Sequence, residues 1–216
     1  IVIFAVVAGV LLYRLRSVLG ERSDDEPAPF AVTVATETSA TPSAPKNVVV
    51  NWASALPNFD WVATATAHHQ LSPVAAADPQ FYPGDFLEKA RRAYVAILSA
   101  YSEGRANTLE LLLAPPLFQT FTQQIERRTA AGESYHVVLH GIKKALISAA
   151  TLDGTQAEVT VDFIAEQSIT HKDKDGLFVG HGDGRRHTTK DAWVFARDLR
   201  SSDPIWRLVR TQEMDD

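Results

Sequence analysis

The sequence predicts an α+β fold in which three helices pack on a curved, four-stranded antiparallel sheet. From residue 83 onward, apolar side chains recur at the spacing of an amphipathic helix, and beyond Gly132 their period changes to two. Turn signals separate the segments of period two. A run of helices followed by a run of strands is typical of domains whose helices cover one face of an antiparallel sheet.

Residues 84–104 form the first predicted helix, with Asp85 as its N-cap and Gly104 as its stop. A short helix over residues 107–115 follows. The third helix covers residues 117–132, because Pro116 is suited to the first turn of a helix.

Four segments predict the strands of one sheet. The first strand covers residues 137–152 and is β-branched and apolar. Asp153-Gly154 is a strong hairpin signal. The remaining strands cover residues 157–170, 189–199 and 204–213, and the Gly-rich segment 171–184 is expected to be a polar loop.

The chain begins with a charge-free apolar run, residues 1–13. A bilayer core of about 30 Å needs roughly 20 helical residues, whereas this run rises only about 20 Å. We therefore expect an anchor helix with several more apolar residues before Ile1. A signal peptide fits less well because its basic residues should precede the run, and a buried core element lacks apolar partners in the segment that follows. The anchor residues are Ile1, Phe4, Val7, Leu11 and Tyr13.

The sequence divides into three parts: an anchor over residues 1–19, a flexible linker over 20–82, and an α+β domain over 83–213. The linker is rich in Pro, Ala, Ser and acidic residues, which bury too little apolar surface to fold alone. Arg14 and Arg16 set the topology, because basic residues tend to stay on the cytoplasmic side. The N-terminus is then outside and the domain is cytoplasmic.

Composition excludes several functions. A net charge of −5 gives no support to nucleic-acid binding, which needs a basic surface. The absence of cysteine excludes disulfides, thiolate zinc sites and cysteine nucleophiles. We expect no cofactor and no metal. His171, His181 and His187 match no common zinc spacing, and the loop from His171 to Gly182 lacks the first and last ligands of a calcium loop.

Two groups of residues in the domain are candidate binding sites. The first is an apolar pocket between the helices and the concave face of the sheet, lined by Phe86, Tyr94, Leu98, Phe163, Trp193 and Phe195. The second is a set of cations that could contact anionic lipid headgroups near the membrane surface, namely Arg91, Arg92, Lys143 and Lys144.

An enzyme would need an acid–base group in the pocket, and His140 on the first strand is the candidate, with Arg197 or Arg210 as its partner. A single strand histidine is typical of a structural role, and no nucleophile elbow or phosphate loop accompanies it. The sequence therefore favours a non-enzymatic protein.

Five segments carry a family resemblance: FLEKARRAYVAILSAYSEG, LLAPPLFQTFTQQIERRTAAG, AEVTVDFIAEQ, DAWVFARDL and DPIWRLVRTQ. They resemble the membrane-associated C-terminal domain of the mitochondrial inner-membrane import-motor scaffold, the Tim44-like domain. They are more similar still to its bacterial relatives, the TimA-type adaptors of alphaproteobacteria, whose anchor resembles FAVVAGVLLYRLRSVLG. The matching positions are Phe86, Ala90, Arg91, Tyr94, Leu112, Pro116, Ile125, Arg128, Val161, Phe163, Trp193, Phe195, Trp206 and Leu208.

The resemblance implies a cone-shaped fold of the nuclear-transport-factor or cystatin-like kind. It also implies an adaptor at the bacterial inner membrane that binds membrane lipid and a protein partner, in protein transport or in the assembly of a membrane complex. This chain lacks the long basic N-terminal region with which the mitochondrial scaffold recruits its chaperone. Two other functions remain open: a tethered carrier or sensor of a small apolar ligand such as a fatty acid, and a pocket enzyme that uses His140.

Overall fold

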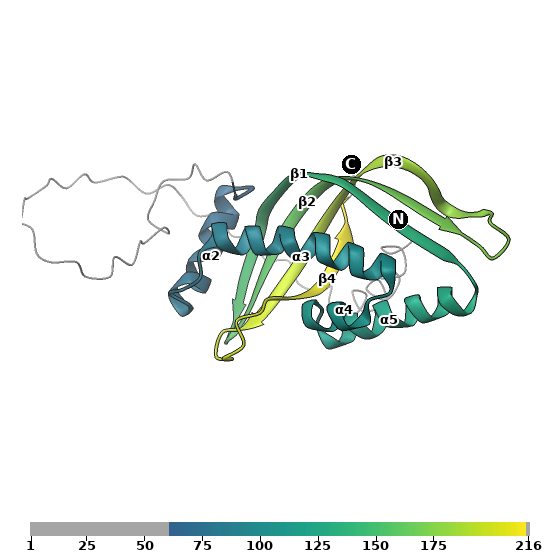
Figure 1. Cartoon of the computed structure of the whole chain (residues 1–216). Coiled ribbons are helices and arrows are strands. Elements are labelled where there is room, and N and C mark those ends of the chain that lie inside the picture. The colour runs from purple at the N-terminus through teal and green to yellow at the C-terminus, as the bar shows by residue number, and fades with distance from the viewer. Residues whose placement is uncertain (1–60, 215–216) are drawn as a thin grey trace, which may run out of the picture.

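A computed structural model describes residues 61–214 (Figure 1). The described part contains four helices followed by four strands. The helices are α2 (Ala65–Ala77), α3 (Pro83–Glu103), α4 (Ala106–Leu112) and α5 (Pro115–Ala130), and the strands are β1 (Ser134–Asp153), β2 (Gln156–Lys172), β3 (Phe178–Asp198) and β4 (Arg207–Glu213).

The strands form one antiparallel sheet in the order β1-β2-β3-β4, as the sequence predicts. The turn at Asp153-Gly154 joins β1 to β2, and Gly154 has the positive φ of 58° that such a turn requires. Three register shifts interrupt the pairing of β1 with β2, one of them at Gly141. Bulges of this kind bend a strand and increase its twist, and α3 lies across the curved face that results (Figure 1).

The core lies between α3 and the concave face of the sheet. On α3, the buried side chains recur at helical spacing, and on β2 every second residue from Ala157 to His171 is buried. The helix ends at Gly104, whose left-handed φ of 71° confirms its predicted role. It begins at Pro83 rather than after Asp85, because proline at the first helical position needs no N–H partner.

The prediction of three helices is wrong, because α2 forms in a segment expected to belong to the linker. Thr64 caps it by accepting from the amide of Ala67, and Leu71 is fully buried. Gln70 accepts a hydrogen bond from the backbone N–H of Ala150 on β1, at 3.2 Å. Apart from alanine, the segment carries only two aliphatic residues, Leu71 and Val74, and it contains Pro73, so packing of this face against β1 is needed to stabilise the helix.

The predicted anchor, residues 1–19, and the linker up to residue 60 lie outside the described residues. Between residues 61 and 214, no helix combines the length and apolar character needed to cross a bilayer.

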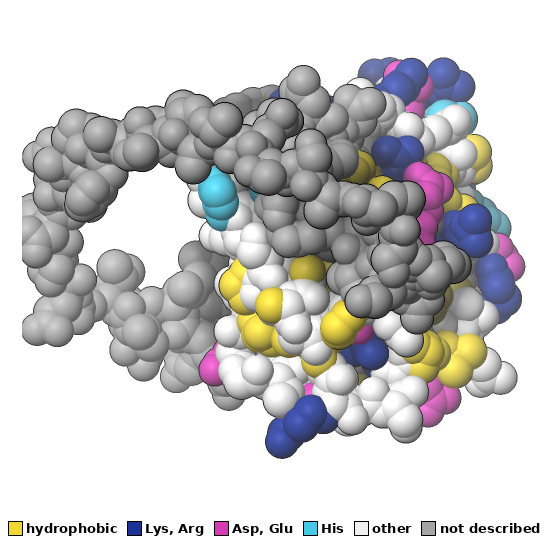
Figure 2. Space-filling model, turned by 90° about the vertical axis from the view of Figure 1, so that its left-hand side faces the viewer, with side chains coloured by type: hydrophobic (Ala, Val, Ile, Leu, Met, Phe, Trp, Pro, Cys, Tyr) yellow, Lys and Arg dark blue, Asp and Glu magenta, His cyan; other side chains and the backbone are white. Residues whose placement is uncertain are grey.

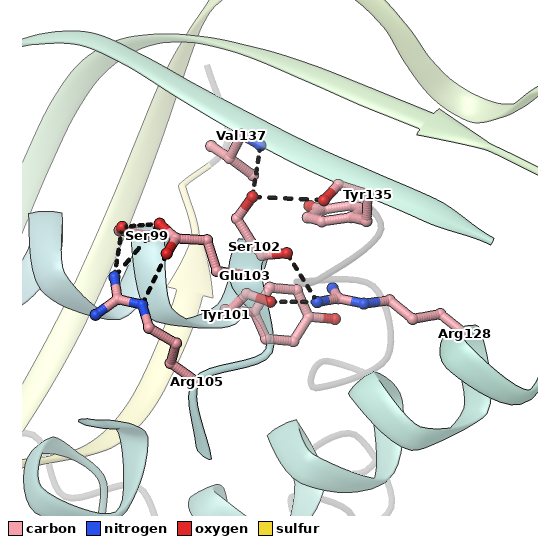
Figure 3. Close-up of polar contacts among 8 residues, drawn as sticks. All are labelled: Ser99, Tyr101, Ser102, Glu103, Arg105, Arg128, Tyr135 and Val137. Atoms are coloured by element: carbon pink, nitrogen blue, oxygen red, sulfur yellow. Dashed lines mark hydrogen bonds and ion pairs between the residues drawn. The ribbon is translucent and has the colours of Figure 1, made fainter. Parts of the chain in front are cut away.

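Arg128 fixes α5 to α3 and β1 (Figure 3). Its guanidinium donates to the carbonyl oxygens of Tyr101 and Ser102 at the end of α3. The same group lies over the rings of Tyr101 and Tyr135, 4.5 and 4.9 Å from their centroids. A planar, always-charged group can form both kinds of contact at once, which an ammonium cannot.

We expect Arg128→Lys to lower the free energy of unfolding by about 1–3 kcal/mol, because hydrogen bonds to carbonyls and stacking on two rings are lost together. Urea denaturation of the full chain measures this. Arg127→Lys is the matched control, because Arg127 is exposed on the same helix turn. Equal midpoints for both variants would show that Arg128 does not hold the helices together.

Candidate functional site

The six residues predicted to line a pocket come together between α3 and the sheet, but most of them are core. Tyr94 on α3 stacks on Phe163 of β2 and contacts the tilted ring of Trp193 on β3, with ring centroids 4.5 Å apart in each pair. Leu98 is also buried. Phe86 and Phe195, in edge-to-face contact at 5.9 Å, differ from the others because they also border a groove at the surface.

We call this feature the apolar groove. It lies between α3, the end of α4 and the segment that joins β3 to β4, and its volume is about 270 Å³. Lys89 is the charged side chain at its margin. Figure 2 views the domain from the left-hand side of Figure 1 and shows hydrophobic side chains gathered on the part of this face that the grey residues leave uncovered. The lining residues are Phe86, Lys89, Ala90, Ala93, Leu112, Phe195, Pro204, Ile205 and Trp206.

Trp206 forms the wall of the apolar groove opposite α3. Its indole contacts Phe86 and Phe81, with ring centroids 5.1 and 5.6 Å away. Ile205, its neighbour, remains 39% exposed. Five of the positions that carry the family resemblance line this groove, namely Phe86, Ala90, Leu112, Phe195 and Trp206.

The sequence analysis does not single out Asp191, which falls near the start of the strand predicted over residues 189–199. Because β3 begins at Phe178, Asp191 instead lies well inside the strand, on the same face as Trp193 and Phe195. It is 1% exposed, and its carboxylate accepts from the Tyr94 hydroxyl at 3.2 Å. Burial raises the pKa of Asp191 to about 6, against the opposing effect of hydrogen bonds from the Tyr94 and Thr189 hydroxyls. A carboxylate held in this way is a group that could bind a ligand or a proton.

His140 does not lie in the interior, so the structure contradicts its role as a pocket acid–base group. The side chain is exposed on the convex face, where its ring contacts the Ser168 hydroxyl at 2.8 Å and Arg186 at 3.2 Å. Its proposed partners lie elsewhere. Arg197 pairs with Asp78 at 2.8 Å, and Arg210 pairs with Glu158 at 2.6 Å.

The four candidate lipid-contacting cations differ in their surroundings. Arg91 contacts Glu88 at 3.7 Å and the carbonyl of Ala145 at 3.4 Å, and Lys143 pairs with Glu166 at 3.2 Å. Arg92 and Lys144 are exposed. Arg91 therefore ties α3 to β1. Lys143 is exposed like Arg92 and Lys144 but is held in its ion pair with Glu166, so Arg92 and Lys144 are the better placed to meet a membrane surface.

The three histidines considered as zinc ligands lie around a second cavity, at the far end of β2 and β3. His171 is buried and its Nε2 contacts the Glu133 carboxylate at 2.7 Å. His181 and His187 line the same cavity. Among residues 61–214 no group of three histidine or carboxylate side chains has the geometry of a metal site.

The fold and the site define the class of the protein. It is a small α+β domain in which one long helix closes the concave face of an antiparallel sheet, with an apolar groove beside that helix. A family model of the Tim44-like domain matches residues 67–213. The chain therefore belongs to the Tim44-like domain family.

Solved structures of other proteins resemble the domain only distantly. The intermembrane-space region of chloroplast protein ARC6 is 16% identical, with a TM-score of 0.40 over 60% of this chain and 97% of that chain. A nuclear transport factor 2-like protein from Salmonella enterica serovar Typhimurium is 12% identical, with a TM-score of 0.38 over 62% and 92%. These scores are too low to carry an argument about function. Comparison with curated proteins gives no match.

We expect Asp191→Asn to stabilise the protein at neutral pH. An unfolded aspartate has a pKa near 3.8, so between about pH 4 and 6 the folded chain keeps a proton that the unfolded chain has lost. The contribution of Asp191 to the free energy of unfolding is therefore most favourable below pH 4, and it falls as the pH rises through 6. A shift of this size corresponds to roughly 3 kcal/mol at most.

Urea denaturation of the wild type and Asp191→Asn at pH 4.0 and pH 7.5 measures the effect. The variant should exceed the wild type in stability at pH 7.5 and match it at pH 4.0. Asp162→Asn serves as the control, because Asp162 faces outward on β2 and bonds to Ser148. If Asp191→Asn raised the free energy of unfolding equally at both pH values, the ionised, buried carboxylate would not be the cause of the increase.

Proposed function

We propose that this chain is a non-enzymatic adaptor of the TimA type, anchored in the inner membrane of an alphaproteobacterium. Residues 1–19 anchor it, with the N-terminus outside and the domain on the cytoplasmic side. The domain binds a protein partner, in protein transport or in the assembly of a membrane complex. Membership of the Tim44-like family supports a binding or scaffold domain.

The observation that carries the proposal is the apolar groove. Of its family-matching residues, Leu112 and Trp206 are only partly buried, and the neighbouring Ile205 is exposed. Tryptophan is one of the residues most enriched among the binding hot spots of protein–protein interfaces. We infer that the groove receives an apolar side chain from a partner segment.

The size of the groove favours a protein partner over a lipid or fatty acid. Sites for small molecules usually enclose about 300–1,000 Å³. The apolar groove, at about 270 Å³, is smaller than these and is open to the surface. It suits one or two inserted side chains better than an acyl chain, so the carrier of an apolar ligand is the second candidate function.

The proposal also includes an electrostatic attraction between the domain and anionic membrane lipid. Arg92 and Lys144 are exposed, and each could add on the order of 1 kcal/mol near an anionic bilayer. This attraction would hold the domain against the membrane in which residues 1–19 are embedded. It would not select a partner.

A charge placed in the groove should abolish partner binding. The tagged full chain carrying Ile205→Glu, purified in detergent from membranes, should recover its partner at less than about a tenth of the wild-type yield, because burial of an unpaired charge is strongly unfavourable. Ile205 is exposed, so the fold should remain.

Leu177→Glu is the matched control, because Leu177 is 66% exposed on the β2–β3 connection, away from the groove. Equal recovery by both variants, or recovery of the bait alone by the wild type, would contradict the proposal. Native mass spectrometry of the same preparations tests the second candidate, which requires an apolar ligand that the wild type retains and Ile205→Glu loses.

A further inference from the structure

The outer edge of β3 is only partly covered by β4. The pairing of the two strands ends at Asp191, beyond which the backbone N–H of Met214 donates to the carbonyl oxygen of Lys190 at 2.9 Å. Within residues 61–214, no strand pairs with the rest of this side of β3. Figure 1 shows β2 and β3 continuing together beyond the end of β4. We call residues 185–189 the free edge of β3.

The backbone of the free edge is arranged to pair with another strand. The carbonyl of Lys190 points toward β4, and backbone groups alternate in direction along a strand. The N–H and C=O groups of Thr188 and Arg186 therefore point to the same open side. β2 and β3 keep a regular register as far as Arg186, so no bulge interrupts this row. An unpaired row of this kind is the template on which an extended peptide adds a strand.

The two outermost strands of the sheet, by contrast, are partly covered. On β1, the N–H of Ile147 donates to the carbonyl of Trp61, and its C=O accepts from the N–H of Ala63, both at 2.8 Å. On β4, the carbonyl of Leu208 accepts from the N–H of Ala114 at 2.9 Å. Proteins usually cover edges in this way because an open edge pairs with other chains. Among the described residues, the free edge of β3 has no such cover.

A cavity of about 360 Å³ lies beside the free edge, at the end of the sheet opposite the apolar groove. We call it the mouth cavity. Tyr135 of β1 and Ile169 of β2 form its apolar wall, and Arg185 and His187 of the free edge also line it. In a peptide that adds to an edge, every second side chain points to the same face of the sheet. One such side chain could enter the cavity, which would make the pairing specific.

The free edge is basic in a protein whose net charge is −5. The side chains of Arg185 and Arg186 are 87% and 60% exposed, and their ion pairs with Asp183 and Glu166 are 3.4 and 3.7 Å long. Exposed pairs of this kind contribute little free energy, so both guanidiniums can exchange them for the carboxylates of a partner. Two copies of this edge would bring like charges together, which disfavours pairing of the chain with itself.

We propose that the free edge of β3 binds an extended acidic segment of a partner protein as an additional strand. Main-chain hydrogen bonds to Thr188 and Arg186 hold the segment. An aliphatic or aromatic side chain of the segment enters the mouth cavity, and its carboxylates meet Arg185 and Arg186. Because this surface is separate from the apolar groove, the domain can hold two partner segments at once.

A peptide that alternates acidic and apolar residues, Glu-Val-Glu-Phe-Glu-Val-Glu, tests the proposal. Fluorescence anisotropy of the labelled peptide with the full chain in non-ionic detergent should show saturable binding, with a Kd on the order of 10–100 μM. The same peptide with lysine in place of every glutamate should not bind, because its charges would repel the two arginines.

Two N-methylated peptides test the main-chain pairing. One carries the methyl groups on the two central glutamates, and the other carries them on the phenylalanine and the valine that follows it. Only one of these sets of N–H groups can face β3, because the groups alternate in direction along a strand. One peptide should therefore bind about tenfold more weakly than the parent, or worse, and the other should bind like the parent.

Arg185→Glu should weaken binding of the acidic peptide about tenfold or more, because it brings like charges together. Arg200→Glu is the matched control. Arg200 lies on the β3–β4 connection, is 79% exposed, and contacts the aspartate two residues before it, as Arg185 does.

Three results would overturn the proposal: binding of the lysine peptide, equal affinities of the two N-methylated peptides, or the same Kd for Arg185→Glu and the wild type. Equal affinities of the N-methylated peptides would mean that the edge attracts charge alone, as it would at a membrane surface. Loss of partner recovery by Ile205→Glu is independent of all three results.

Discussion

The contact of the Tyr94 ring with the rings of Phe163 and Trp193 is the interaction on which the rest of the domain depends. It joins the middle of α3 to the two central strands, and all three side chains are essentially excluded from solvent. Rings of this size bury more apolar area than any aliphatic side chain. Because the stack fixes α3 on the concave face, it also sets the positions of the residues at both ends of that helix.

This contact positions two different features, a buried carboxylate and an aromatic surface. The Tyr94 ring packs in the core while its hydroxyl reaches the carboxylate of Asp191, so the same side chain stabilises the interior and places a polar group there. At the N-terminal end of α3, Phe86 continues the aromatic packing outward to Trp206 at the surface. The domain thus keeps a carboxylate within its apolar core and an apolar groove at its surface, two local departures from what stability alone favours. Such departures are expected at sites that bind other molecules.

Sequence reasoning could predict the sheet because its signals are local. The alternation in β2 assigns Val161 and Phe163 to one face, and the Asp153-Gly154 turn sets the first hairpin. The same alternation brings Trp193 and Phe195 together with Phe163. The groove-lining Trp206 was identified by family resemblance, although its place beside Phe86 depends on tertiary structure.

The errors arise where tertiary contacts override local pattern. The Gly-rich segment 171–184 is predicted to be a loop, yet β3 starts at Phe178, and so Asp191 lies well inside a strand rather than near its start. For α2, the Ala-rich, proline-containing sequence gives little sign of a helix that packing on β1 stabilises. Tyr135 of β1 is buried. A strict period of two counted from it assigns Val138 and His140 to the opposite, convex face, where the structure has them.

We propose that the apolar groove is where this Tim44-like domain binds a protein partner. A photoreactive amino acid at position 205, with position 177 as the reference, tests it most directly in living cells. The account predicts one discrete protein–protein adduct from position 205 and none from position 177. Adducts only with lipid, or the same set of adducts from both positions, would contradict it.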